Sequence, residues 1–220
     1  MKTWRVLSAL LAYPEPWLVR GLEECRATLD SEKLLGRANR NAIEQLINHL
    51  ADTPLIQLQS SYVDWFDRTP ANSLHLFEHI YGDNRARGQA LADLSDTYAR
   101  QGLAISSNET PDYLPLFLEY LSLLKPKQTQ ASLGVVVDLL ETLRLRLHKR
   151  SSPYQAVFAA LLELARLKPD SSKVQAALRL DDGSLPQVAR VEASWEEAPA
   201  FSCSTCDSGD SCTSQQEHTL

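Results

Sequence analysis

Apolar residues recur along most of the chain at alternating spacings of three and four positions, which is the period of an amphipathic α-helix. The pattern predicts helices over approximately residues 4–12, 16–29, 41–52, 55–66, 73–81, 85–101, 113–124, 131–149 and 153–167. Leu and Ala dominate while Val and Ile are sparse, a composition that favours helices over strands. We therefore expect an all-α fold, arranged as a helical bundle.

Proline and glycine mark several of the predicted helix boundaries. The residue before a proline is pushed out of the helical region, so Pro14 and Pro54 end the helices that precede them. Gly82 is an expected C-terminal stop, because glycine tolerates the left-handed conformation that commonly ends a helix. Asp112 is predicted to be the N-cap of the helix that follows it, which places Pro115 in the first turn, where its missing N–H costs no hydrogen bond.

The chain has 220 residues, enough for one domain with a substantial core and a tail. After residue 180 the composition becomes polar and acidic, so we expect a single domain over residues 1–180 and a flexible, cysteine-containing tail over residues 181–220. Four residues of the tail at helical spacing predict one short amphipathic segment: Leu185, Val188, Val191 and Trp195. The spacing Cys203-x-x-Cys206-x5-Cys212, with His218 beyond it, fits either a zinc clip or free thiols.

The net charge is −6, which argues against sequence-independent nucleic-acid binding and suits a basic partner segment. Residues 1–180 contain a single cysteine, Cys25, so no disulfide forms within them and an intracellular location is expected. The charged and then apolar N-terminus resembles a secretory signal, but Arg5 interrupts the apolar run and no small-x-small cleavage site precedes Pro14, so export is not expected. No apolar run approaches the length of a transmembrane helix, so stable membrane insertion is not expected.

The greatest density of chemically active side chains lies between Tyr62 and Ala90. Within it, His75, Glu78 and His79 form the spacing H-x-x-E-H, which is known from a group of zinc peptidases. On a helix the two imidazoles would share one zinc ion, with a third ligand from a residue such as Glu109 or Glu119. A five-residue pattern without supporting context is weak, so a zinc-dependent hydrolase is the alternative interpretation and no bound metal or cofactor is our expectation.

Two longer stretches carry a resemblance to a known family. They are Phe66-Asp67-Arg68, Ser73-Leu74, Leu76-Phe77-Glu78-His79, Gly82, Arg85 and Arg87-Gly88-Gln89-Ala90 in the first, and the run from Pro111 to Leu121 in the second. Together they resemble the NarJ/NarW family of respiratory nitrate reductase assembly chaperones, which is similar to the wider redox-enzyme maturation chaperones. Tyr62-Val-Asp-Trp65-Phe66 matches an aromatic element of that wider family. Glu109-Thr-Pro111-Asp112-Tyr113 matches a second element, except that Tyr113 stands where the family has a histidine.

The resemblance implies an all-helical, non-enzymatic, cytoplasmic chaperone. It implies that the partner is the catalytic alpha subunit of nitrate reductase, held through its N-terminal segment while molybdenum cofactor and iron–sulfur clusters are inserted. It further implies that the chaperone is not a subunit of the mature enzyme. The identity of the client isoform, the oligomeric state and direct contact with the molybdenum cofactor stay open.

We expect aromatic residues around these two stretches to line a groove for an amphipathic helix, with acidic residues such as Asp64 and Asp67 near its rim. The candidate client-binding residues are Tyr62, Trp65, Phe66, Phe77, Glu78, His79, Tyr81, Asp112, Tyr113, Phe117, Glu119 and Tyr120. Two alternatives remain: the aromatic residues are ordinary core, and Glu119 belongs to an internal ion pair. Arg85 and Arg87 are expected in structural ion pairs with nearby carboxylates.

Overall fold

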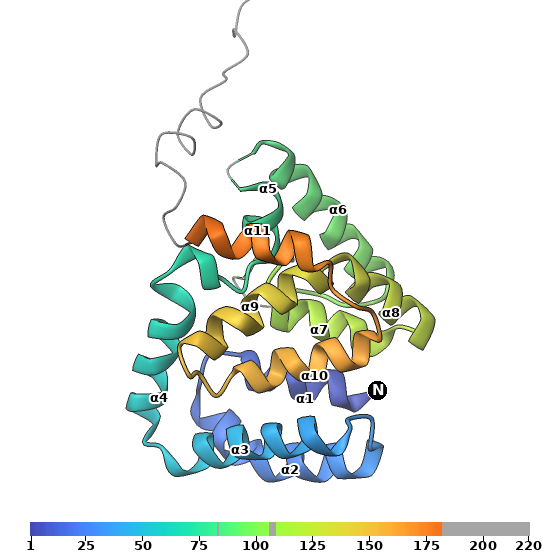
Figure 1. Ribbon diagram of the computed structural model, residues 1–220. Coiled ribbons are helices and arrows are strands. Elements are labelled where there is room, and N and C mark those ends of the chain that lie inside the picture. Colours follow the sequence, from blue (N-terminus) through green and yellow to red (C-terminus); the bar gives the residue numbers. More distant parts are fainter. Residues whose placement is uncertain (83, 106–108, 182–220) are drawn as a thin grey trace, which may run out of the picture. The chain divides into compact units, whose positions relative to one another are not determined.

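The computed structural model describes residues 1–82, 84–105 and 109–181, which lie within one compact unit, residues 1–185 (Figure 1). The α-helices are α1 Lys2–Leu11, α2 Pro16–Glu32, α3 Arg37–Asp52, α4 Leu55–Tyr62, α5 Leu76–Tyr81, α6 Ala86–Arg100, α7 Leu114–Leu123, α8 Pro126–Val135, α9 Val137–Lys149, α10 Gln155–Ala165 and α11 Ser171–Asp181. Two short turns, a π-helix at Val63–Asp67 and a 3₁₀-helix at Pro70–Asn72, join α4 to α5. The described residues form no strand beyond one isolated bridge, between His75 and Tyr113, and the expected all-α class is confirmed.

The centre of the unit is α1, which packs against α7, α2 and α10. Its apolar stripe is fully used, because Trp4, Leu7, Leu10 and Leu11 are each at most 3% exposed. A helix buried along one whole stripe gains most of its stability from that packing rather than from intrinsic propensity. The position of α1 matters for function, because its remaining face is the floor of the groove described below.

One predicted helix begins four residues earlier than its apolar pattern suggested. The expected start near Asn41 is wrong, since α3 begins at Arg37. A residue distant in sequence explains the difference: Glu163 of α10 accepts hydrogen bonds from the Gly36 N–H, at 2.8 Å, and from the Asn39 side chain, at 2.7 Å. Such a carboxylate satisfies N–H groups that a helix start leaves without partners.

The predicted helix over residues 131–149 is two helices, α8 and α9, which break at Val136. The last turn of α8 comes close to the loop after α10, because a Cβ atom on Gly134 would lie 2.7 Å from Leu167 Cδ1. The helix 55–66 also differs from expectation, since its last turn is the π-helix Val63–Asp67. Neither change alters the apolar stripe, and Leu58, Tyr62 and Phe66 remain buried.

The helix α11 was not expected from the sequence. It packs against α9, with Val174 buried and Lys173 3.5 Å from Asp138 of α9. Asp170 precedes the helix and accepts a hydrogen bond from the Ser172 N–H at 2.9 Å, which is the signature of an N-cap that the sequence contains. The predicted tail segment around Val188 and the tail cysteines lie outside the described residues.

Candidate binding groove

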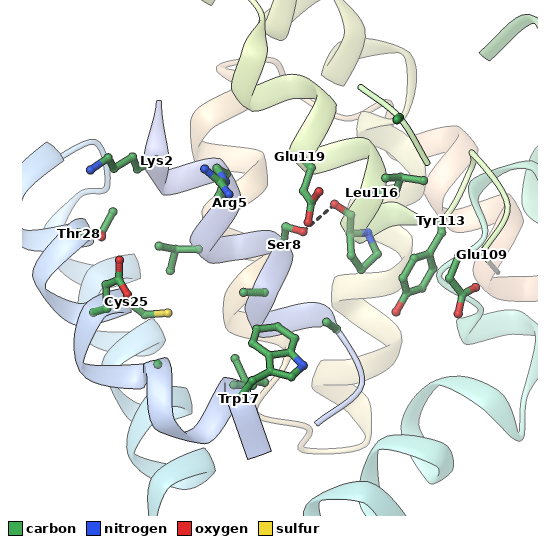
Figure 2. A pocket seen from close by; sticks show the side chains of 18 residues that line it. Lys2, Arg5, Ser8, Trp17, Cys25, Thr28, Glu109, Tyr113, Leu116 and Glu119 are labelled. Carbon is green, nitrogen blue, oxygen red and sulfur yellow. Dashed lines mark hydrogen bonds between the residues drawn. The ribbon is translucent and has the colours of Figure 1, made fainter. Parts of the chain in front are cut away.

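An open groove of about 690 Å³ lies over one face of α1, between α2 on one side and, on the other, Ala104, Glu109 and the residues 113–119 at the start of α7 (Figure 2). This volume lies within the range of about 300–1,000 Å³ that is typical of ligand pockets. Its lining consists of Lys2, Arg5, Val6, Ser8, Ala9, Ala12, Trp17, Leu18, Gly21, Glu24, Cys25, Thr28, Ala104, Glu109, Tyr113, Pro115, Leu116 and Glu119.

Several residues at the floor of the groove are small. Ala9 of α1, and Ala12 directly after that helix, are only partly buried, although the opposite stripe of α1 is core. Ser8 is fixed by a 2.7 Å hydrogen bond from its hydroxyl to the Pro115 carbonyl, so this contact joins α1 to α7 beneath the groove. A Cβ atom on Gly21 of α2 would meet nothing within 4 Å, which shows that the space beside this glycine is open.

The walls combine apolar surface with carboxylates. Trp17 is 48% exposed, a large apolar surface for a side chain on the wall of a groove. Glu24 lines the α2 side, and Glu109 and Glu119 line the other side. Two cations, Lys2 and Arg5, stand at the α1 N-terminal end (Figure 2).

Glu119 is exposed and is the one charged residue of α7, a helix that is otherwise mostly apolar. Within the described part of the chain its carboxylate belongs to no ion pair, and it points into the groove (Figure 2). Among the described residues, therefore, Glu119 does not have the internal ion pair that was the alternative. The sequence anticipated this possibility, because a carboxylate in an apolar helix is either paired or directed into a groove.

Next to the groove residue Tyr113, the side chain and backbone of Asp112 connect the segment that begins α5 to the segment that begins α7. Asp112 is fully buried, and its carboxylate accepts a 2.9 Å hydrogen bond from the Phe77 N–H and another from the Thr110 hydroxyl. The backbone completes the connection, with the Leu76 N–H on the Asp112 carbonyl at 3.0 Å and the Leu114 N–H on the Leu74 carbonyl at 2.8 Å.

The predicted role of Asp112 as N-cap of α7 is wrong. Tyr113 occupies the N-cap position of α7, and no side-chain hydrogen bond caps that helix. The carboxylate instead caps the first turn of α5, 35 residues earlier in the chain. Residue type and position identify a candidate capping residue, but they do not reveal which helix it caps when tertiary folding brings two segments together.

Electrostatics stabilise the ionised form of this buried carboxylate. Burial by itself would raise the pKa of Asp112, but contacts with His75 and Thr110 and the Phe77 N–H lower the pKa below its ordinary value. The reciprocal effect appears at His75, whose pKa is raised chiefly by Asp112, against the opposing effect of burial. The His75 Nδ1 lies 3.6 Å from the carboxylate and 3.0 Å from the Thr110 hydroxyl.

The H-x-x-E-H residues do not form a metal site. Contrary to the predicted helix over residues 73–81, α5 begins at Leu76 and His75 has an extended backbone. His79 Nε2 contacts the Ser73 carbonyl at 2.8 Å, and Glu78 lies 3.3 Å from Arg87. In the three described ranges, no group of three or more His, Cys, Asp or Glu side chains is placed to share a metal ion.

Arg87 joins this network, which confirms the expectation of a structural ion pair at that position. Its guanidinium lies 3.3 Å from Glu78 and 4.0 Å from Asp112, so one cation serves two carboxylates on different elements. A charge shared in this way stabilises the buried Asp112 carboxylate, which would otherwise be costly.

The predicted aromatic residues divide into core and surface. Tyr62, Phe66, Phe117 and Tyr120 are each at most 8% exposed and pack in the core. Trp65 and Phe77 are partly buried, and Tyr81 is 36% exposed. Of the twelve candidate client-binding residues, only Tyr113 and Glu119 line the groove. Their part in binding stays a prediction for all twelve.

Sequence reasoning missed most of the groove, including Ala9, Ala12, Trp17 and Gly21. A signal was present along α1, where the non-core side carries the charged residues Lys2 and Arg5 first and then the small residues Ala9 and Ala12. The missing bulk, rather than any reactive side chain, distinguishes this face.

These observations define a class of protein: an all-helical protein with an open, partly apolar groove and, in the part of the chain that the structure describes, no metal-ligand cluster. Residues 32–160 match the family model described as nitrate reductase delta subunit. The chain therefore belongs to that family.

Three curated relatives match this chain over most of their length. The chain is 35% identical over 192 residues to the nitrate reductase molybdenum cofactor assembly chaperone NarJ of Escherichia coli (strain K12), covering 87% of this chain and 81% of the relative. It is 34% identical over 197 residues to the probable chaperone NarW of the same strain, covering 90% and 82%. It is 29% identical over 165 residues to the probable NarJ of Bacillus subtilis (strain 168), covering 73% and 86%.

The predicted family resemblance is thus confirmed. Because these relatives are assembly chaperones rather than catalysts, the expectation that this protein is not an enzyme is confirmed as well. Among the described helices, none has both the length and the apolar character required to cross a membrane.

Proposed function

We propose that this protein is a dedicated chaperone of a respiratory nitrate reductase. It binds the N-terminal segment of the catalytic alpha subunit in the cytoplasm and keeps the subunit competent while molybdenum cofactor and iron–sulfur clusters are inserted. It leaves before the enzyme is mature, so it is not a subunit of the final complex. The observation that carries this proposal is the match to assembly chaperones of nitrate reductase over at least 81% of their length in the two Escherichia coli relatives.

The groove supplies a physical means of holding a polypeptide. An amphipathic helix binds a groove by burying its apolar face, and each apolar side chain removed from water contributes about 1.5–3 kcal/mol. Trp17, Leu116 and the small floor residues offer such surface. Glu24, Glu109 and Glu119 add carboxylates, which orient a basic segment and raise its association rate more than its affinity.

The remaining candidate client-binding residues support the groove or flank it. Tyr62, from the core, contacts the Tyr113 hydroxyl at 3.2 Å and so positions a groove residue. Asp112 and the α5 residues Phe77, Glu78, His79 and Tyr81 form the turn next to Tyr113, and we include them as a second contact region for the client.

The test is recovery of the client from cells that express the reductase subunits. Tagged full-length protein should recover the alpha subunit before membrane assembly, and the alpha subunit from cells lacking the chaperone should contain less molybdenum and iron. Recovery of no alpha subunit, together with normal metal content in the absence of the chaperone, would refute the proposal. His75→Ala should leave recovery nearly unchanged, which separates this function from a zinc-dependent one.

A further inference from the structure

We infer that the groove over α1 accepts one amphipathic helix of the client in a single direction, with its N-terminal end at Glu109 and Trp17 and its C-terminal end at Lys2 and Arg5. This inference rests on the proposed function, because the client segment supplies the helix. It goes further by stating which surface binds that helix and in which direction the bound helix runs.

The dimensions of the groove suit one helix. Its floor runs along α1 from Lys2 to Ala12, a length of about 15 Å at 1.5 Å per residue, which corresponds to about ten residues of a bound helix. Helices pack with axes about 8–10 Å apart, and the closest approach requires small side chains at the contact. Ala9, Ala12 and Gly21 provide such a contact, and the space at Gly21 is open.

The two ends of the groove differ in charge. Lys2 and Arg5 stand at one end, near Thr28 (Figure 2). Because α1 ends at Leu11 and α2 begins at Pro16, Trp17 lies at the other end, which it shares with Tyr113 and Glu109 (Figure 2). Neither Lys2 nor Arg5 makes a side-chain ion pair with another described residue, so both cations are available to a ligand.

This asymmetry selects a direction. A helix carries partial positive charge at its N-terminus and partial negative charge at its C-terminus, and each matched end contributes about 0.3–1 kcal/mol. The N-terminal end is therefore favoured beside Glu109, and the C-terminal end beside Lys2 and Arg5. Glu24 and Glu119, on opposite walls, face the flanks of the helix and favour basic residues on both sides of its apolar stripe.

The same charges argue against the protein's own tail as occupant. The tail segment that is amphipathic in sequence carries Glu192, Glu196 and Glu197 and only one basic residue, Arg190. Three groove carboxylates would repel it. A basic segment of another chain is the better electrostatic complement.

Cys25 provides a direct test, because it lines the groove on α2 near Thr28, at the Lys2 end. The protein is the full chain with Cys203, Cys206 and Cys212 replaced by Ser, which leaves Cys25 as its single thiol. The probes are two synthetic peptides of the alpha-subunit N-terminal segment that differ only in which end carries a cysteine, activated as a mixed disulfide. The peptide tagged at its C-terminal end should link to Cys25 about tenfold faster, since proximity dominates the rate of such reactions.

A second protein controls for thiol reactivity. In it, Cys25 is replaced by Ala and Ala12 by Cys, so that the single thiol stands at the opposite end of the groove while Glu109, Lys2 and Arg5 are all retained. The preference should reverse, with the peptide tagged at its N-terminal end linking faster. The ratio of the two rates is taken within each protein, so a loss of affinity common to both peptides cancels.

The possible outcomes distinguish a failure of the inferred binding site and direction from a failure of the proposed chaperone function. Equal rates on both proteins, or the reverse preference, would overturn the polarity. If calorimetry shows that the peptide binds but the bound peptide does not protect Cys25 from alkylation, then the binding site lies elsewhere. That result would refute this inference and leave the proposed function intact. No peptide binding at all would remove both. A Cys25 that is already protected in the free chain and becomes reactive on Trp195→Asp would identify the tail as occupant and refute the inference.

Discussion

The aromatic core around Tyr62 and the groove over α1 use opposite means to shape neighbouring parts of one molecule. In the core, the rings of Tyr62, Phe66 and Tyr154 are 4.8 to 5.9 Å apart and fill the space between α4, the π-helix and α10. In the groove, alanine and glycine leave space unfilled. The comparison teaches that large side chains mark where the protein is closed, whereas their absence marks where it is open to a partner.

The largest effect should follow from removing the buried carboxylate of Asp112. Asp112→Ala leaves the Phe77 N–H, the Thr110 hydroxyl and the His75 ring without their acceptor, and should lower the free energy of unfolding by about 3 kcal/mol. Urea denaturation measures the change. Asp112→Asn keeps an acceptor oxygen and nearly the same volume, so it should lose clearly less; equal losses for the two variants would mean that the negative charge, rather than the acceptor oxygen, is responsible.

Filling the groove should affect binding and spare the fold. Gly21→Leu places a side chain where a Cβ atom meets nothing within 4 Å, so stability should be maintained or slightly increased, since glycine within a helix costs about 0.5–1 kcal/mol. Affinity for the client peptide, measured by calorimetry, should fall at least about tenfold, or 1.4 kcal/mol. Ala27→Leu, on an exposed position of α2 outside the groove, is the matched control and should bind normally. Normal binding by Gly21→Leu would show that the groove over α1 is not the client-binding site.

Within the core, the hydroxyl groups of two neighbouring tyrosines should contribute differently to the free energy of unfolding. The Tyr62 hydroxyl donates a 2.7 Å hydrogen bond to the Leu11 carbonyl, so Tyr62→Phe should cost about 1 kcal/mol in the free energy of unfolding. The buried Tyr154 hydroxyl has no hydrogen-bond partner among the described residues, so Tyr154→Phe should be neutral or slightly stabilising. Similar losses for both would point to an unseen partner of Tyr154.

The smallest effect concerns pH. The pKa of His75 is raised in the fold above its ordinary value near 6.5, so its charged form stabilises the native state. That stability is present below the ordinary pKa and is lost as pH rises through the raised pKa. Wild-type protein should therefore be slightly more stable at pH 6 than at pH 8, and His75→Gln should reduce this difference, as denaturation at both values would reveal.

The exposed His49 serves as the control for this measurement. His49→Gln should retain the wild-type difference between pH 6 and pH 8. The lowered pKa of Asp112 acts in the acid range, where its contribution is lost as pH falls through that pKa. An unchanged difference in His75→Gln would mean that another group is responsible.

Much of the local structure followed from the sequence alone. Apolar periodicity predicted the helices that form the core, because each must bury one stripe whatever its neighbours are. The helix break at Pro14 and the C-terminal stop at Gly82, which has a φ of +55°, were also predictable, because proline and glycine act through their own backbone geometry. The family was recognisable from residues around Phe66 and Pro111, and the absence of a distinctive catalytic set agreed with it.

Only the tertiary structure decided the features that depend on residues distant in sequence. The start of α3 depends on Glu163, the helix capped by Asp112 lies 35 residues away, and the groove exists because α2 and α7 flank the small-residue face of α1. The aromatic density that suggested a binding surface is largely packed inside, as Tyr62 and Phe66 illustrate. Periodicity reports which face of a helix is apolar, but whether that face meets another helix or an open groove is set by how distant segments pack.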